Sequence, residues 1–199
     1  MKPKLVVIFG GPRPGKNTDR ALDLLLSGMA LDQFELVRFD LRKMKIHPCT
    51  GCYQCAETGC CVFRDDMDRI LKSVDEADGV ILATPFYFNS VSALTKTMID
   101  RFQVKWTRKF MLKDQAISKA KKGLLLVTAG AVQKKNESDG ARLVAELFFK
   151  SIRASFENFI FIEGTDEKPV AEHQERHGNL KTAGAEFANV ILETVQNEV

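Results

Sequence analysis

The sequence contains no apolar run long enough to cross a membrane. Its first continuous apolar run, Leu5 to Phe9, is far shorter than the roughly 20 residues that a membrane-spanning helix needs, and too short for the core of a secretory signal. No targeting motif is recognisable in the chain. The sequence therefore predicts a cytoplasmic protein that does not interact with a membrane.

A strong excess of one charge is also missing. The 29 Lys and Arg residues against 26 Asp and Glu residues give a formal net charge of +3, which gives little support for a polyanionic partner. The basic side chains concentrate at Lys105, Arg108, Lys109, Lys113, Lys119, Lys121 and Lys122. We interpret this stretch as a solvated, lysine-rich connection and predict no binding to nucleic acid.

Cysteine is missing outside one short stretch. All five cysteines lie between positions 49 and 61, whereas a secreted disulfide framework would distribute them over distant segments. Cys49, Cys52, Cys55 and Cys61 form the pattern C-x2-C-x2-C-x5-C, and Cys60 is left over. Soft thiolates grouped this tightly suit a 4Fe–4S cluster. Free thiols, a zinc site and a disulfide are the alternatives.

The chain does contain a regular alternation of strand-like and helix-like segments. Short apolar runs predict strands over residues 5–9, 36–39, 79–83, 124–127 and 159–162, and apolar residues recur at helical spacing between them. Strands that alternate with helices predict a doubly wound parallel α/β sheet with helices on both faces. Since 199 residues leave little room for a second domain, we expect residues 1–199 to form a single one.

The segment after the third predicted strand illustrates how the helices are expected to begin and end. Ser90 is in a position to cap the helix that carries Leu94 and Met98. Asp100 and Arg101 follow at its end, and we expect them to form an ion pair with a structural or interface role.

The turn after the first strand is rich in glycine. Residues 10–18 read GGPRPGKNT and lead into a predicted helix, whose N-terminus presents unpaired N–H groups to an anion. Arg13, Asn17 and Thr18 can add side-chain donors. A phosphate monoester is a suitable guest for such a loop.

Two other interpretations of this turn are open. Gly10, Gly15 and Lys16 match the nucleotide-triphosphate loop G-x-x-x-x-G-K-[ST], but Asn17 replaces the hydroxyl that should hold Mg²⁺, and Pro14 removes a backbone donor. The turn can also be a structural one without a ligand. Because the dinucleotide fingerprint G-x-G-x-x-G is absent, the sequence favours FMN over a tightly bound NAD.

Two further loops follow predicted strands, at residues 85–91 and 128–131. In doubly wound sheets, ligands bind beyond the carboxyl ends of the strands. Phe86, Tyr87 and Phe88 offer walls for a flat heteroaromatic ring, while Asn89 and Ser90 offer polar groups for its edge. The alternative is that these aromatic side chains belong to the core.

Taken together, these motifs resemble the NADPH-dependent FMN reductase-like family of flavodoxin-like fold, and within it the iron–sulfur flavoproteins. The resemblance depends on GGPRPGKNT at 10–18, PCTGCYQCAETGCCVFRDDM at 48–67 and TPFYFNSVSALTKTMIDR at 84–101, about half of the chain. It implies a five-stranded flavodoxin-like sheet of order 2-1-3-4-5. One departure from the family pattern is Gly11, where a serine is usual, and Lys16 can compensate through its charge.

The resemblance also implies which residues hold the cofactors. The FMN phosphate would lie against Gly11, Pro12, Arg13, Lys16, Asn17 and Thr18. The flavin ring would lie against Pro85, Phe86, Tyr87, Phe88, Asn89 and Ser90, with Thr128, Ala129 and Gly130 on the other side. In the cysteine-rich loop at 48–61, Cys49, Cys52, Cys55 and Cys61 would bind a 4Fe–4S cluster.

The function that follows is an FMN-dependent oxidoreductase without a catalytic acid or base. Electrons would pass from NAD(P)H or a reduced carrier through FMN to a flavin, quinone, iron or oxygen acceptor. The first alternative is an electron carrier with a 4Fe–4S cluster and little NAD(P)H activity. The second is a P-loop nucleotide-binding protein. The resemblance further implies a homodimer or homotetramer, with small-molecule or protein electron donors and acceptors as partners.

Overall fold

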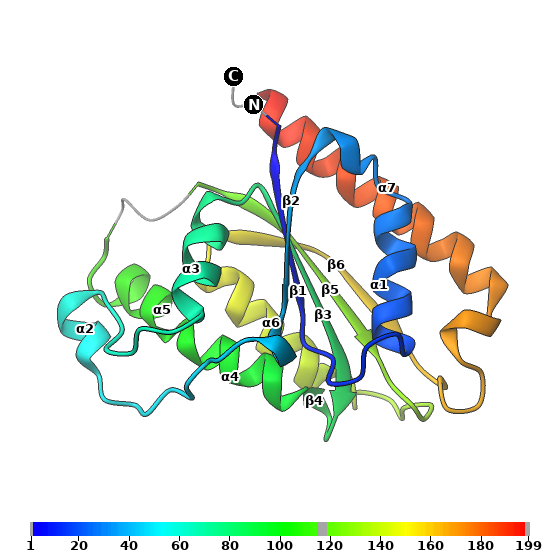
Figure 1. The fold of residues 1–199 in the computed structure, drawn as a ribbon, viewed down its shortest axis with the longest axis horizontal. Coiled ribbons are helices and arrows are strands. Elements are labelled where there is room, and N and C mark those ends of the chain that lie inside the picture. The colour runs from blue at the N-terminus through cyan, green and yellow to red at the C-terminus, as the bar shows by residue number, and fades with distance from the viewer. Residues whose placement is uncertain (1, 115–118, 198–199) are drawn as a thin grey trace.

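The computed structural model describes residues 2–114 and 119–197. Five parallel strands form the main sheet in the order β2-β1-β3-β5-β6 (Figure 1). They are β1 (Lys4–Phe9), β2 (Glu35–Asp40), β3 (Gly79–Tyr87), β5 (Lys121–Thr128) and β6 (Ala154–Ile162). Counted along the chain, this is the predicted order 2-1-3-4-5. The flavodoxin-like arrangement is confirmed.

One short strand was not expected. β4 (Ser90–Val91) pairs antiparallel with the end of β3, with Tyr87 opposite Ser90. β3 continues through Pro85, which still pairs with Thr128 of β5.

Helices cover both faces of the sheet (Figure 1). α1 (Asn17–Ser27) and α7 (Gln174–Asn197) pack on one face. α3 (Met67–Glu76), α4 (Ala93–Arg101), α5 (Gln103–Phe110) and α6 (Asp139–Ser151) pack on the other, with the short α2 (Gln54–Thr58) against α5. Single 3-10 turns occupy Leu31–Gln33, Leu41–Lys43 and Val170–Glu172.

The strands alternate their buried side chains between two cores, as period-2 geometry requires. Leu5, Val7 and Phe9 face α1 and α7, whereas Val6 and Ile8 face the opposite layer. All five side chains are fully buried or nearly so. Such burial on both faces explains why β1 appears in the sequence as a continuous apolar run.

Two expectations about single residues are wrong. Ser90 lies in β4, and Ser92 caps α4 instead, where its side chain accepts a hydrogen bond from the Thr95 N–H. Asp100 pairs with Lys96, and Arg101 pairs with Asp65 rather than with its chain neighbour. The expected ion pair is absent because successive residues of a helix, such as Asp100 and Arg101, point to different faces.

The lysine-rich stretch is not uniformly solvated either. Lys105 is 4 % exposed and Lys121 is 2 % exposed. Lys105 pairs with Asp75, while Lys121 donates hydrogen bonds to the carbonyl oxygens of Lys119 and Ile152. Asp75 and Ile152 come from other segments, so composition alone did not indicate them. Within residues 2–114 and 119–197, no helix combines the length and apolar character needed to cross a membrane.

Candidate functional site

The loops that follow β1, β3, β5 and β6 enclose a small cavity at the carboxyl edge of the sheet. Its volume is about 40 Å³, room for roughly three water molecules by size and suited to a phosphate group. The lining residues are Gly11, Pro12, Arg13, Lys16, Asn17, Thr18, Pro85, Phe86, Tyr87, Thr128, Gly130, Thr165 and Asp166. The structure thus brings together most of the residues predicted to hold FMN, from three distant loops.

The first turn of α1 is open to an anion. Lys16 precedes the helix without a side-chain cap, so the first N–H groups stay directed toward the cavity edge. Gly15 has a φ of +67°, a left-handed conformation that favours glycine. Arg13 and Lys16 are exposed beside it, and both can donate charge-assisted hydrogen bonds to a phosphate.

Two polar side chains of this turn are engaged with the protein itself. The Asn17 amide donates to the Thr165 carbonyl oxygen at 3.3 Å and accepts from the Val170 N–H at 3.1 Å. The buried Thr18 hydroxyl lies 2.5 Å from that of Thr128. These side chains position the backbone around the cavity, and Asn17 is occupied where a triphosphate site would need a Mg²⁺ ligand.

The aromatic loop forms a two-residue hairpin between β3 and β4. Phe88 and Asn89 both have positive φ angles, 48° and 55°, the combination found in a type I′ turn. Positive φ is unusual for a phenylalanine and costs conformational energy. Phe86 and Tyr87 line the cavity, but Phe88, Asn89 and Ser90 lie outside it, and Phe88 is fully exposed at the tip.

The β5 loop agrees with the prediction in part. Thr128 and Gly130 line the cavity, whereas Ala129 is buried and forms hydrogen bonds through its backbone. Its N–H donates to the Ile162 carbonyl oxygen, and its own carbonyl oxygen accepts from the Thr165 N–H and hydroxyl. Ala129 therefore joins the ends of β5 and β6.

Sequence analysis missed the loop after β6. Thr165 and Asp166 line the cavity, and the Asp166 N–H donates to the Gly130 carbonyl oxygen at 3.0 Å. The signal that could have found them is their place directly after the fifth predicted strand, since the same rule had selected the other loops.

A buried hydroxyl network connects the glycine-rich turn at residues 10–18, the candidate phosphate loop, with α4. The Ser92 hydroxyl donates to the Gly10 carbonyl oxygen at 2.7 Å, and the Ser92 N–H donates to the Thr84 hydroxyl at 3.1 Å. The Thr95 hydroxyl donates to Thr84 at 3.0 Å. A Cβ atom on Gly10 would lie 1.8 Å from the Thr95 hydroxyl oxygen. The close approach of these loops therefore requires glycine at position 10.

The cysteine-rich loop is closed at its base by two aspartates. Asp65 accepts a hydrogen bond from the His47 N–H at 2.9 Å, and Asp66 accepts from the Lys45 N–H at 2.7 Å. Farther along the loop, the Thr107 hydroxyl of α5 donates to the Cys55 carbonyl oxygen at 3.2 Å. The loop is thereby held against the α4–α5 layer.

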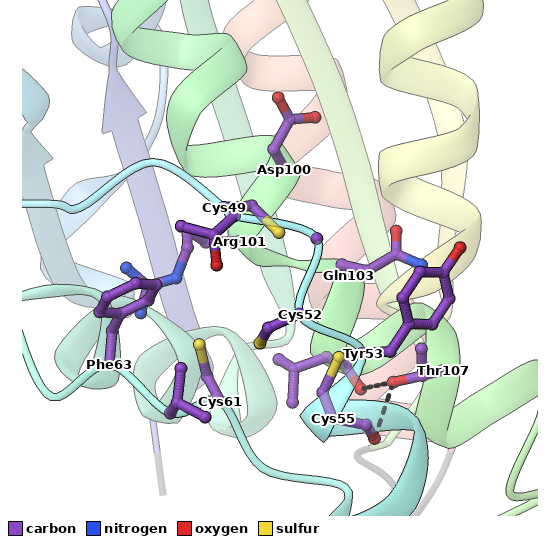
Figure 2. Close-up of a pocket in the computed structure, with 14 residues that line it drawn as sticks. Cys49, Cys52, Tyr53, Cys55, Cys61, Phe63, Asp100, Arg101, Gln103 and Thr107 are labelled. Atoms are coloured by element: carbon purple, nitrogen blue, oxygen red, sulfur yellow. Dashed lines mark hydrogen bonds between the residues drawn. The ribbon is translucent and has the colours of Figure 1, made fainter.

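Four cysteines of this loop line one cavity of about 370 Å³. They are Cys49, Cys52, Cys55 and Cys61, the four predicted ligands, and Figure 2 shows their thiol groups around a common space. Cys60 is exposed and does not line it. Tyr53, Phe63 and Val104 add apolar walls.

The donor set fits a cluster better than a single metal ion. Among the described residues, no three His, Cys, Asp or Glu side chains are placed to hold one ion. A 4Fe–4S cluster takes one thiolate at each iron, so its four thiols surround a volume rather than one point. The residues present, four soft donors in one apolar-walled cavity, therefore fit such a cluster.

Arg101 reaches this cavity from the end of α4 with its side chain only 1 % exposed. It donates to the Asp65 carboxylate at 2.6 Å and the His47 carbonyl oxygen at 2.8 Å. Burial opposes its charged form, but the Asp65 hydrogen bond and the interaction with the Cys61 side chain raise the pKa of Arg101 above its ordinary value. Burial likewise raises the pKa of Asp65, yet the hydrogen bonds from Arg101, His47 and Met67 lower it overall.

The family of the chain follows from comparison with known proteins. A family model described as NADPH-dependent FMN reductase matches residues 3–154. The chain belongs to this family. The resemblance stated from the motifs is confirmed, and FMN is the cofactor expected of a member.

Named relatives of this FMN reductase family member include iron–sulfur flavoproteins. One from Archaeoglobus fulgidus is 44% identical over 98 residues, which are 49% of this chain and 44% of the relative. One from Methanocaldococcus jannaschii is 42% identical over 98 residues, 49% of this chain and 51% of the relative. The chain thus matches about half the length of these curated relatives.

Solved structures agree in fold. An FMN-dependent NADH-azoreductase from Bacillus anthracis, in complex with FMN, has a TM-score of 0.70 at 13% identity, over 94% of this chain and 99% of that one. An NAD(P)H:quinone oxidoreductase from Methanothermobacter marburgensis has a TM-score of 0.67 at 17% identity, over 96% of each chain. At these identities the likeness supports the flavodoxin-like fold alone.

Proposed function

We propose that this FMN reductase family member is an iron–sulfur flavoprotein that transfers electrons between a reduced donor and an acceptor. The observation that carries the proposal is the single cavity lined by Cys49, Cys52, Cys55 and Cys61, with Cys60 outside it. When bound, FMN accepts electrons in pairs or releases them singly, and a 4Fe–4S cluster exchanges one at a time. The names of the relatives in two archaea support the same assignment.

The FMN phosphate is proposed to lie in the cavity at the start of α1. Arg13 and Lys16 would neutralise it, and the N–H groups of the first helical turn would donate to it. The flavin ring would extend along Pro85, Phe86 and Tyr87 on one side and Gly130 on the other. Thr165 and Asp166 join the site because they line the same cavity.

The position of α4 supports electron exchange between the proposed flavin site and the proposed cluster site. Ser92 at its start is bonded to Gly10 of the phosphate loop, and Arg101 at its end lines the cysteine cavity. The helix is nine residues long, which at a rise of 1.5 Å per residue is roughly 13 Å. The two ends of one helix thus connect the proposed flavin and cluster sites.

The decisive experiment is chemical analysis of protein purified without oxygen. We expect flavin absorption bands on a broad thiolate-to-iron shoulder, and about four iron and four acid-labile sulfide per bound FMN. Flavin bands without iron or sulfide would reject the cluster. Protein that stays colourless after incubation with FMN would reject the flavin site as well.

A second candidate is a plain NAD(P)H-dependent FMN reductase that passes electrons to a flavin, quinone, iron or oxygen. The family model favours this candidate. Steady-state NADH and NADPH oxidation with a panel of acceptors separates the two. Rapid turnover in protein without iron supports the reductase, whereas slow turnover in protein loaded with iron supports the carrier.

We also propose a homo-oligomer. Leu143 and Leu147 of α6 are 57% and 54% exposed, and Phe110 and Met111 are 38% and 49% exposed at the end of α5. Apolar side chains on neighbouring helices are typical of subunit contacts. Light scattering at several protein concentrations tests this, and a monomer throughout would contradict it.

A further inference from the structure

Arg101 uses only part of its hydrogen-bonding capacity within the protein. Its Nη1 atom donates to both the Asp65 carboxylate and the His47 carbonyl oxygen. The guanidinium also lies over the Phe63 ring, with its central carbon 5.2 Å from the ring centroid. These contacts fix the plane and the position of the group, because a planar fork held at one nitrogen and stacked on a ring has little freedom to rotate.

The other edge of the guanidinium is buried without a protein acceptor. Nε and Nη2 have no hydrogen-bond partner among the described residues, although both are shielded from solvent. These two nitrogens form one fork, the geometry with which arginine binds anions. Buried donors in native proteins are almost always satisfied, so this edge calls for a further acceptor.

The cysteine cavity is the place for that acceptor. Arg101 lines it together with Cys61 and Cys49 (Figure 2). The Cys61 side chain is also among the groups that raise the pKa of Arg101. Because four cysteines line this cavity, we take the acceptor to be sulfur, either the thiolate of a ligand or a sulfide of a cluster.

We propose that Arg101 is a positioning residue of the cysteine cavity, whose free edge donates hydrogen bonds to the sulfur atoms of a cluster bound there and raises its reduction potential. This inference depends on the proposed cluster. A buried positive charge and N–H donors both stabilise the more negative, reduced state. The ion pair with Asp65 holds the group in place through Nη1 and leaves Nε and Nη2 unpaired.

Arg101→Gln tests the proposal, with redox titration of anaerobic protein followed by electron paramagnetic resonance. We expect the variant to keep its FMN. The one-electron equilibrium of the cluster should shift at least tenfold toward the oxidised state, which corresponds to a fall of about 59 mV in its reduction potential. Arg64→Gln is the matched control. It removes the same charge from a residue that bonds to the Cys61 carbonyl oxygen but is exposed, where solvent screens the charge, so its shift should be much smaller.

A second variant and a measurement on the unmodified protein keep the proposal testable if Arg101→Gln misfolds. Arg101→Gln combined with Asp65→Asn removes both partners of the buried ion pair and avoids an unpaired carboxylate. In wild-type protein labelled with ¹⁵N-arginine, pulsed resonance spectra of the reduced cluster should show coupling to ¹⁵N. The Arg64→Gln variant should retain this coupling.

The outcomes separate this inference from the proposed function. A loaded cluster without ¹⁵N coupling, or with an unchanged potential in a folded Arg101 variant, would overturn the role of Arg101 and leave the cluster in place. Wild-type protein that contains FMN but no iron or sulfide would overturn the cluster itself, and the inference with it. If the Arg101→Gln variant loses iron while it keeps FMN, the ¹⁵N spectrum of the wild-type protein decides whether Arg101 donates hydrogen bonds to the cluster.

Discussion

At the scale of single residues, the polar side chains of the phosphate loop mainly hold the protein together. Asn17 connects α1 to the loop after β6, and Thr18 connects it to β5. The groups left for a phosphate are the backbone N–H groups and two exposed cations, Arg13 and Lys16. The proposed phosphate site thus lies on a framework of buried hydrogen bonds.

The buried pair of hydroxyls at Thr18 and Thr128 gives a first prediction. Thr18→Val leaves the Thr128 hydroxyl without this partner, and an unsatisfied buried group costs about 1–3 kcal/mol. We expect the free energy of unfolding in urea to fall by that amount. Adding Thr128→Val should recover part of the loss, because both ends of the hydrogen bond are then apolar. If the two substitutions lowered the free energy of unfolding additively, the hydrogen bond between Thr18 and Thr128 would be contradicted. Thr194→Val on α7 serves as a distant control.

Cys60 and Cys61 are neighbours in sequence with different surroundings, and this gives a second prediction. Cys61 lines the cavity and Cys60 is exposed outside it. Cys61→Ser should abolish the thiolate-to-iron shoulder and leave flavin bound, whereas Cys60→Ser should change neither. Iron, sulfide and FMN analysis of the two variants is the measurement. Unchanged iron in Cys61→Ser would make Cys60 the fourth ligand.

At the scale of elements, α1 and α7 touch through reciprocal glycines. A Cβ atom on Gly28 would lie 2.0 Å from the Lys181 carbonyl oxygen, and one on Gly184 would lie 2.0 Å from the Leu25 carbonyl oxygen. The two helices therefore pack backbone against backbone. This contact supports the phosphate loop, because α1 begins at that loop.

The glycine contact predicts opposite effects for two substitutions in α7. Gly184→Ala should lower the free energy of unfolding by about 1–3 kcal/mol or more, as overpacking does. Gly178→Ala, where nothing lies within 4 Å, should instead raise it by up to about 1 kcal/mol through helix propensity. Urea unfolding of both variants tests this. Stabilisation by Gly184→Ala would show that the helices do not approach so closely.

At the scale of the whole molecule, the two edges of the sheet at which the strands begin and end differ in function. The carboxyl edge holds the candidate flavin site, while Lys121 begins β5 at the opposite edge. Burial, together with repulsion from Lys105, Lys119 and Arg153 that Asp75 only partly offsets, lowers the pKa of Lys121 to about 8. This lysine therefore makes the stability of the fold depend on pH, far from the flavin site.

The sign of that dependence follows from proton binding. Below pH 8 Lys121 is protonated in both states, and its buried charge destabilises the fold. As the pH rises from about 8 toward 10.5, the unfolded chain binds more protons than the folded one, so stability increases. At 1.36 kcal/mol per pKa unit the gain is at most about 3 kcal/mol. In the Lys121→Met variant this rise in stability should disappear. Urea unfolding of wild type and variant at about pH 7.5 to 10.5 measures it. Identical pH profiles of the two proteins would contradict the prediction.

Much of the architecture was predictable because its signals are local. The apolar run at Leu5–Phe9, the glycine turn at 10–18 and the cysteine spacing each lie within a few consecutive residues. Together they predicted the strand order, the family and the loops that meet at the carboxyl edge. The fold rule about strand ends then predicted most of the residues around the small cavity.

The sequence by itself determined the five strands of the main sheet, and which loops can carry a phosphate or a cluster, since backbone preferences and motif spacing act along the chain. Only the tertiary structure decided the partners. It brought Asp65 to Arg101, Thr165 to Asn17 and Asp75 to Lys105. Such pairs join residues that are far apart in sequence, and their contacts depend on how the layers pack, which no local pattern records.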